Sequence, residues 1–313
     1  MKKGRIGEII SLLTSFRKLT IPRMRTFLLS LFLFQFSRVE VQTKLLIRCD
    51  DIGMCHAVNM ATMKLLETGM PFSASVMFAC PWYKEAVDIL KTHPEVSVGV
   101  HLTLNSEWKY YKWGPILGKE SVPSLVDSNG YFFETTTQFL ENNPKIDEVE
   151  KELRAQIERA LQSGLRIDYI DHHMGTAAAT PQLRLLFERL AKEYKLGIPH
   201  YFNETYHVLF SVPIESKIDS LIEIVNNLKT GKTNVIVFHI GLENPEMDAL
   251  IDMNYKPMTS PEGVSLVSRH RHAELKALCS KEFREVLGKN KIHLITYHDL
   301  ISKVGLKAMK RPK

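Results

Sequence analysis

Two adjacent carboxylates, Asp50 and Asp51, end a short apolar run over residues 44–49. The run predicts a buried strand, so the pair lies at a strand's carboxyl end. Adjacent carboxylates repel each other and are costly to bury, and a fold keeps them where negative charge is needed, most often for a metal ion or a proton transfer. Because neighbouring side chains point in different directions, one can hold a cation while the other faces a water molecule.

Two histidines follow later apolar runs in the same way. His101 ends the predicted strand over 96–100, and His173 follows the predicted strand over 167–170. Two imidazoles and one carboxylate can hold a divalent ion and leave positions open for water and substrate. Such a site suits hydrolysis, in which a nearby carboxylate takes a proton from water and an imidazole gives one to the leaving amine. The donor set suits zinc and, less sharply, magnesium, manganese or cobalt.

The elements that must position these side chains alternate along the chain. We predict strands over 45–48, 73–78, 96–100, 167–170, 233–238 and 292–296, and helices over 57–67, 82–92, 146–163, 181–194, 214–229 and 267–287. Strand–helix alternation predicts a parallel sheet, and a chain of 313 residues can form one α/β barrel. Active sites of such barrels lie at the carboxyl ends of the strands. The polar candidates all follow predicted strands there: Asp50, Asp51, His101, His173 and His239.

The net charge of +6 lies in the first 41 residues, which carry eight basic and two acidic side chains. The remainder therefore has no basic excess that would attract nucleic acid. Residues 23–25 are Arg-Met-Arg, and an apolar stretch over 26–36 follows them. This pattern predicts a signal peptide in residues 1–41, with Met24 as an alternative start, and export to the periplasm or medium. The apolar stretch is too short to span a bilayer comfortably, and the alternative is an ordinary N-terminal helix of a cytoplasmic protein.

The four cysteines, Cys49, Cys55, Cys80 and Cys279, lack the spacing of a metal site. One disulfide is possible in an exported protein, but buried free thiols are the favoured interpretation.

Five segments, in this order, closely resemble the YdjC-like carbohydrate deacetylases. They are Cys-Asp-Asp-Ile-Gly at 49–53, Val-Gly-Val-His-Leu-Thr-Leu at 98–104, Ile-Asp-His-His at 170–173, Phe-His-Ile-Gly at 238–241 and Arg-His-Ala-Glu-Leu at 271–275. The resemblance covers about residues 45–300. It implies a single distorted (β/α) barrel of the polysaccharide-deacetylase and glycoside-hydrolase type over 42–313, and a hydrolase that removes acetyl groups from N-acetylated sugars or oligosaccharides.

The resemblance also implies roles for individual residues. Asp51, His101 and His173 would bind one divalent metal ion, Asp50 would act as the general base, and His239 would act as the general acid or stabilise the transition state. Asp171 could orient a metal-binding imidazole.

The segment that follows the predicted strand over 167–170 departs from the family pattern. The family's serine position holds His172, and later histidine positions hold Gly175 and Ala177. A swap of His172 for His173 as the ligand therefore stays open, and these departures bear on the choice of substrate more than on the hydrolytic residues.

Substrate contacts are predicted from the aromatic segment 107–113. Trp108, Tyr110 and Trp113 could stack on sugar rings, or the loop could pack its own aromatics against the barrel. Arg271 could bind substrate or clamp Asp50, or it could be a solvated helix residue.

Two other functions compete with hydrolysis. A catalytically inactive carbohydrate-binding barrel would account for the missing histidines after His173. An iron enzyme could also use two histidines and one carboxylate, but the adjacent Asp50 suits proton transfer better. The sequence does not indicate an oligomeric state.

Overall fold

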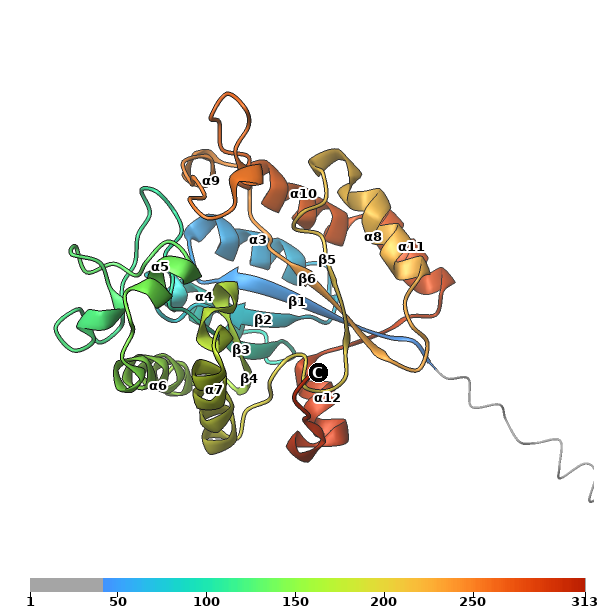
Figure 1. Ribbon diagram of the computed structural model, residues 1–313. Helices are drawn as coiled ribbons and strands as arrows, with labels where there is room; N and C mark the ends of the chain where they lie inside the picture. Colours follow the sequence, from blue (N-terminus) through green and yellow to red (C-terminus); the bar gives the residue numbers. More distant parts are fainter. Residues whose placement is uncertain (1–41, 313) are drawn as a thin grey trace, which may run out of the picture. The chain divides into compact units, whose positions relative to one another are not determined.

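The computed structural model describes residues 42–312, so the predicted leader lies outside the described residues. Seven strands form one sheet in which every pairing is parallel (Figure 1), as the alternation predicts. They are β1 (Lys44–Ile52), β2 (Ser73–Val76), β3 (Ser97–Leu102), β4 (Ile167–His172), β5 (Thr205–Val208), β6 (Thr233–Phe238) and β7 (His293–Ile295). The order is β4-β3-β2-β1-β6-β5, with β7 paired to β1.

Strand β1 lies at the centre of the sheet. It pairs with β6 along residues 44–49 on one edge. On the other edge its first residues, 44–46, pair with β7, and residues 48–52 pair with β2. Within residues 42–312 no ladder joins β4 to β5, so the hydrogen-bonded path is open there, in keeping with the distorted barrel predicted. The α/β class and the parallel sheet are confirmed.

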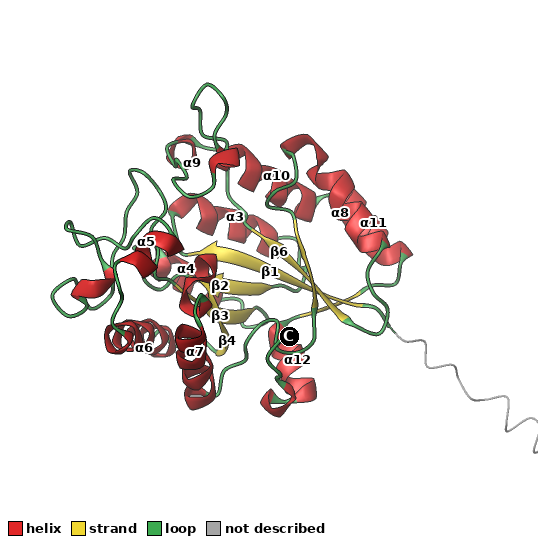
Figure 2. Ribbon diagram, viewed as in Figure 1, coloured by secondary structure: helices red, strands yellow, loops and turns green. Residues whose placement is uncertain are grey.

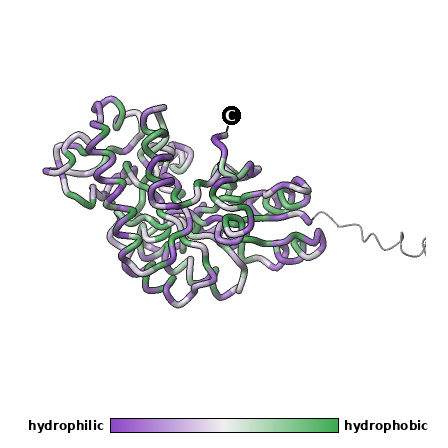
Figure 3. Tube along the Cα trace, turned by 90° about the horizontal axis from the view of Figure 1, so that it is seen from below, coloured by the Kyte–Doolittle hydropathy of each residue, from purple (hydrophilic) through white to green (hydrophobic). Residues whose placement is uncertain are grey.

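Helices surround the sheet, as Figure 2 shows, and one of them, α12 (Tyr297–Val304), packs against its inner cluster of buried residues. They are α3 (His56–Leu66), α4 (Tyr83–Lys91), α5 (Thr136–Glu141), α6 (Ile146–Gln162), α7 (Pro181–Tyr194), α8 (Lys217–Asn226), α9 (Pro245–Asp248), α10 (Val267–Cys279), α11 (Lys281–Lys289) and α12 (Tyr297–Val304). Hydrophilic and hydrophobic stretches alternate along the helical coils (Figure 3), as expected of helices with one buried face. Among the described residues, none of these helices is long and apolar enough to cross a membrane.

Several elements differ from the sequence-based expectation, and the short helices α5 and α9 were not expected at all. The single helix expected over 267–287 is interrupted at Ser280, whose extended backbone ends α10 and whose side chain caps α11 by accepting from the Phe283 N–H. Strand β5 was not expected, because its four residues form no buried apolar run. Helix α12 follows β7 without a break and was also missed.

The two faces of β1 contribute to different parts of the core. Leu45, Ile47 and Cys49 pack in the large cluster between strands and helices. Leu46 belongs to a separate inner cluster, which includes Tyr169, Val235, Ile295 and Tyr297. Because side chains alternate along a strand, the next residues on this inner face are Arg48 and Asp50. The inner face is therefore apolar at the amino end of β1 and charged at its carboxyl end.

All four cysteines are free thiols, and three of them are buried as predicted, whereas Cys279 is partly exposed.

Candidate metal centre

A distortion at the end of β1 brings both aspartates to the same side. Strict alternation would point Asp51 away from Asp50. The register between β1 and β2 shifts between Cys49 and Ile52, and Asp51 has a φ of 63°. A non-glycine residue in this left-handed region costs on the order of 1 kcal/mol or more, and aspartate tolerates it better than most. Gly53 completes the turn with a φ of 85°, and a Cβ there would lie 3.0 Å from the Tyr83 backbone.

The three predicted ligands come together at this distortion. Oδ1 of Asp51 lies 3.4 Å from Nε2 of His101 and 3.2 Å from Nδ1 of His173. All three side chains are buried. Oδ1 of Asp51 has no hydrogen-bond partner in the described part of the chain. Donors bound to one ion at about 2.1 Å lie about 3.0–3.4 Å from one another, so this set fits a divalent metal ion.

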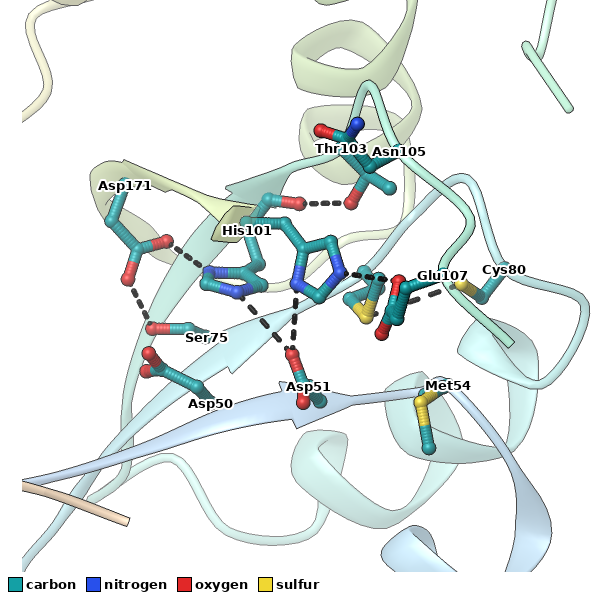
Figure 4. A network of polar contacts seen from close by, with 12 residues as sticks. Asp50, Asp51, Met54, Ser75, Cys80, His101, Thr103, Asn105, Glu107 and Asp171 are labelled. Carbon is teal, nitrogen blue, oxygen red and sulfur yellow. Dashed lines mark hydrogen bonds and ion pairs between the residues drawn. The ribbon is translucent and has the colours of Figure 1, made fainter. Parts of the chain in front are cut away.

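Each histidine places its other ring nitrogen on a carboxylate. Nδ1 of His101 lies 2.8 Å from Oδ1 of Asp171, as Figure 4 shows, and Nε2 of His173 lies 2.9 Å from Oε2 of Glu107. Carboxylates in this position orient metal-binding imidazoles and raise their basicity. Asp171 was predicted for this place. Glu107 was not, because a single acid in a loop carries no sequence signal for a histidine that is 66 positions away.

The charges of these groups favour a cation between them. Burial would raise the pKa of Asp51, but the Arg271 guanidinium and both imidazoles outweigh it and hold this pKa well below its usual range. Burial would lower the pKa of His101, but the carboxylates of Asp171 and Asp50 raise it well above its usual range. For His173, burial is likewise outweighed by Glu107 and Asp51, and its pKa rises to about 9. The same negative potential that holds protons on the imidazoles would attract a divalent ion.

Asp50 is held by a neighbour on its own strand. Nε and Nη2 of Arg48 each lie 2.7 Å from one carboxylate oxygen of Asp50. Nε of Arg48 also lies 3.4 Å from Asp171. Asp50, His101 and Asp171 form a second group with metal-binding distances. In this group a guanidinium already pairs with both carboxylates, so the group around Asp51 is the better metal site.

The prediction that Arg271 clamps Asp50 is wrong. Nη2 of Arg271 lies 2.6 Å from Oδ2 of Asp51 instead. Arg48 takes the place beside Asp50 because two residues of separation put both side chains on one face of β1.

The structure favours His173 over His172 as the ligand. His172 packs its ring against Phe187, with centroids 5.5 Å apart, and burial lowers its pKa. The chain then turns through Met174 and Gly175, at φ values of 52° and 78°. His173 is left facing Asp51.

His239 ends β6 and lines the same cavity as the aspartates. Its ring contacts Phe210, with centroids 5.2 Å apart. Its backbone N–H donates to Oε2 of Glu274 at 2.6 Å. Its Nδ1 is buried and makes no hydrogen bond within residues 42–312.

The cavity above these groups has a volume of about 400 Å³. Of the three aromatics predicted to contact substrate, Trp108 lines it. Trp113 is buried behind His173 and donates its indole N–H to the carbonyl of Asn105, so it packs in the loop. Tyr110 is 73% exposed and does not line this cavity. Two aromatics that were not predicted, Phe210 and Tyr255, line it instead.

Fold and site together define an α/β protein with a parallel sheet and a buried group of two histidines and one carboxylate at the strands' carboxyl ends. The profile of the family described as YdjC-like protein matches residues 44–289, so the chain belongs to the YdjC-like family.

Relatives with assigned names agree with this membership. A carbohydrate deacetylase of Brevibacillus brevis is 28% identical over 265 residues, which covers 82% of this chain and 99% of that protein. A carbohydrate deacetylase of Enterococcus faecalis is 33% identical over 156 residues, 50% of this chain and 57% of that protein. A crystal structure from Enterococcus faecalis, provisionally described as a cellobiose-phosphate cleavage protein, has a TM-score of 0.66 at 26% identity. The match covers 83% of this chain and 99% of the chain in that crystal structure.

Proposed function

We propose that this protein is a metal-dependent carbohydrate deacetylase that hydrolyses the acetamide of an N-acetylated sugar. The observation that carries the proposal is the buried Oδ1 of Asp51, which lies between two imidazoles without a hydrogen bond to a described residue, with Asp50 beside it in one cavity. The names of the relatives support the substrate class.

Asp51, His101 and His173 would hold the divalent ion, zinc or magnesium, with cobalt or manganese as alternatives. When bound, such an ion lowers the pKa of water and polarises a carbonyl oxygen. Asp50, fixed by both arms of the Arg48 guanidinium, accepts a proton from the attacking water. His239 donates a proton to the departing amine. The products are acetate and the free amino sugar.

Aromatic side chains around the cavity would bind the sugar. Trp108, Phe210 and Tyr255 each line it, and aromatic rings offer apolar faces to sugars. Arg271 lies over the Trp108 ring at 5.6 Å from its centroid and pairs with Asp51, so its role is to hold these groups in place.

The test is acetate release from N-acetylated mono- and oligosaccharides by metal-stripped protein, with and without added zinc, magnesium, cobalt or manganese. We expect release that depends on added metal. His101→Ala should lose metal retention and acetate release together, because it removes one of three ligands. Tyr110→Ala is the control and should keep both, since Tyr110 lies outside the cavity lining.

Unchanged acetate release by a folded His101→Ala variant would contradict the metal assignment. Sugar binding without acetate release, with every metal tried, would instead support an inactive binding barrel.

A further inference from the structure

A fully buried ion pair lies behind the proposed acid. Nζ of Lys217, at the start of α8, lies 3.0 Å from Oε1 of Glu274 in α10. Lys217 is 0% exposed and Glu274 is 1% exposed. Taking two charges out of water is costly unless further hydrogen bonds satisfy them. The remaining partners of the pair therefore show what it holds in place.

Each member of the pair also binds backbone next to the cavity. Oε2 of Glu274 accepts the backbone N–H of His239 at 2.6 Å. Nζ of Lys217 donates to the carbonyl of Leu209 at 2.7 Å, one residue before Phe210. The pair thus joins the end of β6, the loop after β5 and helix α10.

Helix α10 connects this pair to the metal centre. Arg271 lies three residues before Glu274, and side chains with this spacing share one face of a helix. Arg271 binds Asp51, and Glu274 binds the backbone of His239. One rigid face of α10 therefore sets the distance between a proposed metal ligand and the proposed acid.

The imidazole of His239 has few other anchors. Its Nδ1 makes no hydrogen bond to any described residue, and its ring contacts Phe210. Its backbone anchor and the Phe210 contact therefore place the ring, and both depend on the Lys217–Glu274 pair.

We propose that Lys217 and Glu274 are positioning residues that place His239 for protonation of the leaving amine. The proposal rests on the proposed function, because it assumes that His239 is the general acid. A general acid must come within about 2.6–3.2 Å of the atom that it protonates. A small displacement of the β6 end would remove this contact without disturbing the three proposed metal ligands.

The experiment compares two substrates that differ in their need for an acid. Release of an amine from an N-acetyl sugar needs a proton, whereas 4-nitrophenyl acetate loses a stable phenolate without one. The main variant is Lys217→Met with Glu274→Met, which removes both charges together, leaves no uncompensated ion and takes away the acceptor of the His239 N–H. We expect kcat on the N-acetyl sugar to fall about tenfold or more, since general acids contribute about 10²–10⁴-fold. KM, metal content and 4-nitrophenyl acetate hydrolysis should stay within about twofold, the scatter expected of mutational effects away from the reacting groups.

Two further variants complete the comparison. His239→Ala should show the same selective loss, and adding it to the double variant should cause little more, because residues that act through one group are not additive. Asp168→Asn is the matched control. Asp168 is also an acid whose side chain is largely buried and has several partners, Arg166, Ser97 and His298, but it lies at the amino end of β4. It should leave the ratio of the two activities unchanged.

Equal loss on both substrates, or additive loss with His239→Ala, would overturn the positioning role. If this double variant does not fold, Lys217→Met with Glu274→Gln, which also removes both charges but keeps an amide acceptor, gives the same comparison with a smaller expected loss. Absence of acetate release by the unaltered protein would refute the proposed function instead, and the two failures are therefore distinguishable.

Discussion

Buried charges around the site are arranged so that each meets an opposite charge. Arg48 pairs with Asp50 and Asp171, and Arg271 pairs with Asp51. Each imidazole lies between two carboxylates, His101 between Asp171 and Asp51, and His173 between Glu107 and Asp51. Such pairing makes burial of these groups tolerable, whereas removal of one partner leaves a charge without compensation. Oδ1 of Asp51, which lies near both imidazoles but makes no hydrogen bond to a described residue, is the position where this arrangement can accept a further cation.

Arg48→Lys should separate the roles of the two aspartates. Lysine keeps the positive charge but cannot bind both oxygens of Asp50 as a guanidinium does. We expect kcat to fall by about tenfold, a fraction of what a general base contributes, while metal content stays at one ion per chain. Kinetics of acetate release and metal analysis of the same sample measure both.

Arg271→Lys is the matched comparison, since Arg271 binds the proposed ligand Asp51. It should weaken metal retention. Loss of metal from Arg48→Lys as well would show that the Arg48–Asp50 pair supports the metal centre and not the base alone.

Strands β2, β3 and β4 support the site from beneath through one tyrosine. Tyr169 of β4 lies over Gly99 of β3, where an added Cβ would meet the ring at 2.2 Å. The Tyr169 hydroxyl lies 2.9 Å from Oγ of Ser75 in β2, which donates to Asp171 at 2.7 Å. The close approach of β3 to this ring therefore fixes the carboxylate that orients His101. Only glycine leaves room for it.

Gly99→Ala should destabilise the fold by about 1–3 kcal/mol, the usual cost of overpacking a core. It should also lower acetate release, because Tyr169 must move and Ser75 and Asp171 move with it. Urea unfolding midpoints and activity measure the two effects. Gly288→Ala in α11 is the control, because its Cβ meets no atom within 4 Å. It should stabilise by about 0.5–1 kcal/mol, as alanine does within helices. Equal midpoints for the two variants would contradict this account of Gly99.

Residues far apart in the chain form the candidate metal site only when the whole sheet is assembled. Asp51, His101 and His173 come from β1, β3 and the turn after β4. The unfolded chain does not hold these donors together, so metal binding should stabilise the folded state.

Removal of metal by a chelator should therefore lower the midpoint of thermal unfolding. A ligand present at 100 times its dissociation constant stabilises by about 2.7 kcal/mol, which corresponds to about 5 °C for a domain of this size. Thermal scans before and after re-addition of zinc measure the shift. His101→Ala should show no such shift, and a full shift in that variant would place the metal elsewhere.

The sequence was sufficient for the features that depend on local pattern. Alternating apolar runs and helical periods predicted the parallel α/β fold, and the strand-end positions predicted which side chains meet at one edge. The exported leader stays a prediction, because residues 1–41 lie outside the described part. The local pattern did not predict β5, which has no apolar run, or the break at Ser280.

Tertiary packing was needed for the contacts between distant positions. Glu107 beside His173, Arg271 on Asp51 and Lys217 on Glu274 join residues 57 to 220 positions apart. The turn of Asp51 into the cavity also depends on the shifted register between β1 and β2. A pattern of residue types indicates which side chains are able to pair. Which arginine pairs with which acid depends on the side chains that the folded backbone brings within hydrogen-bonding distance.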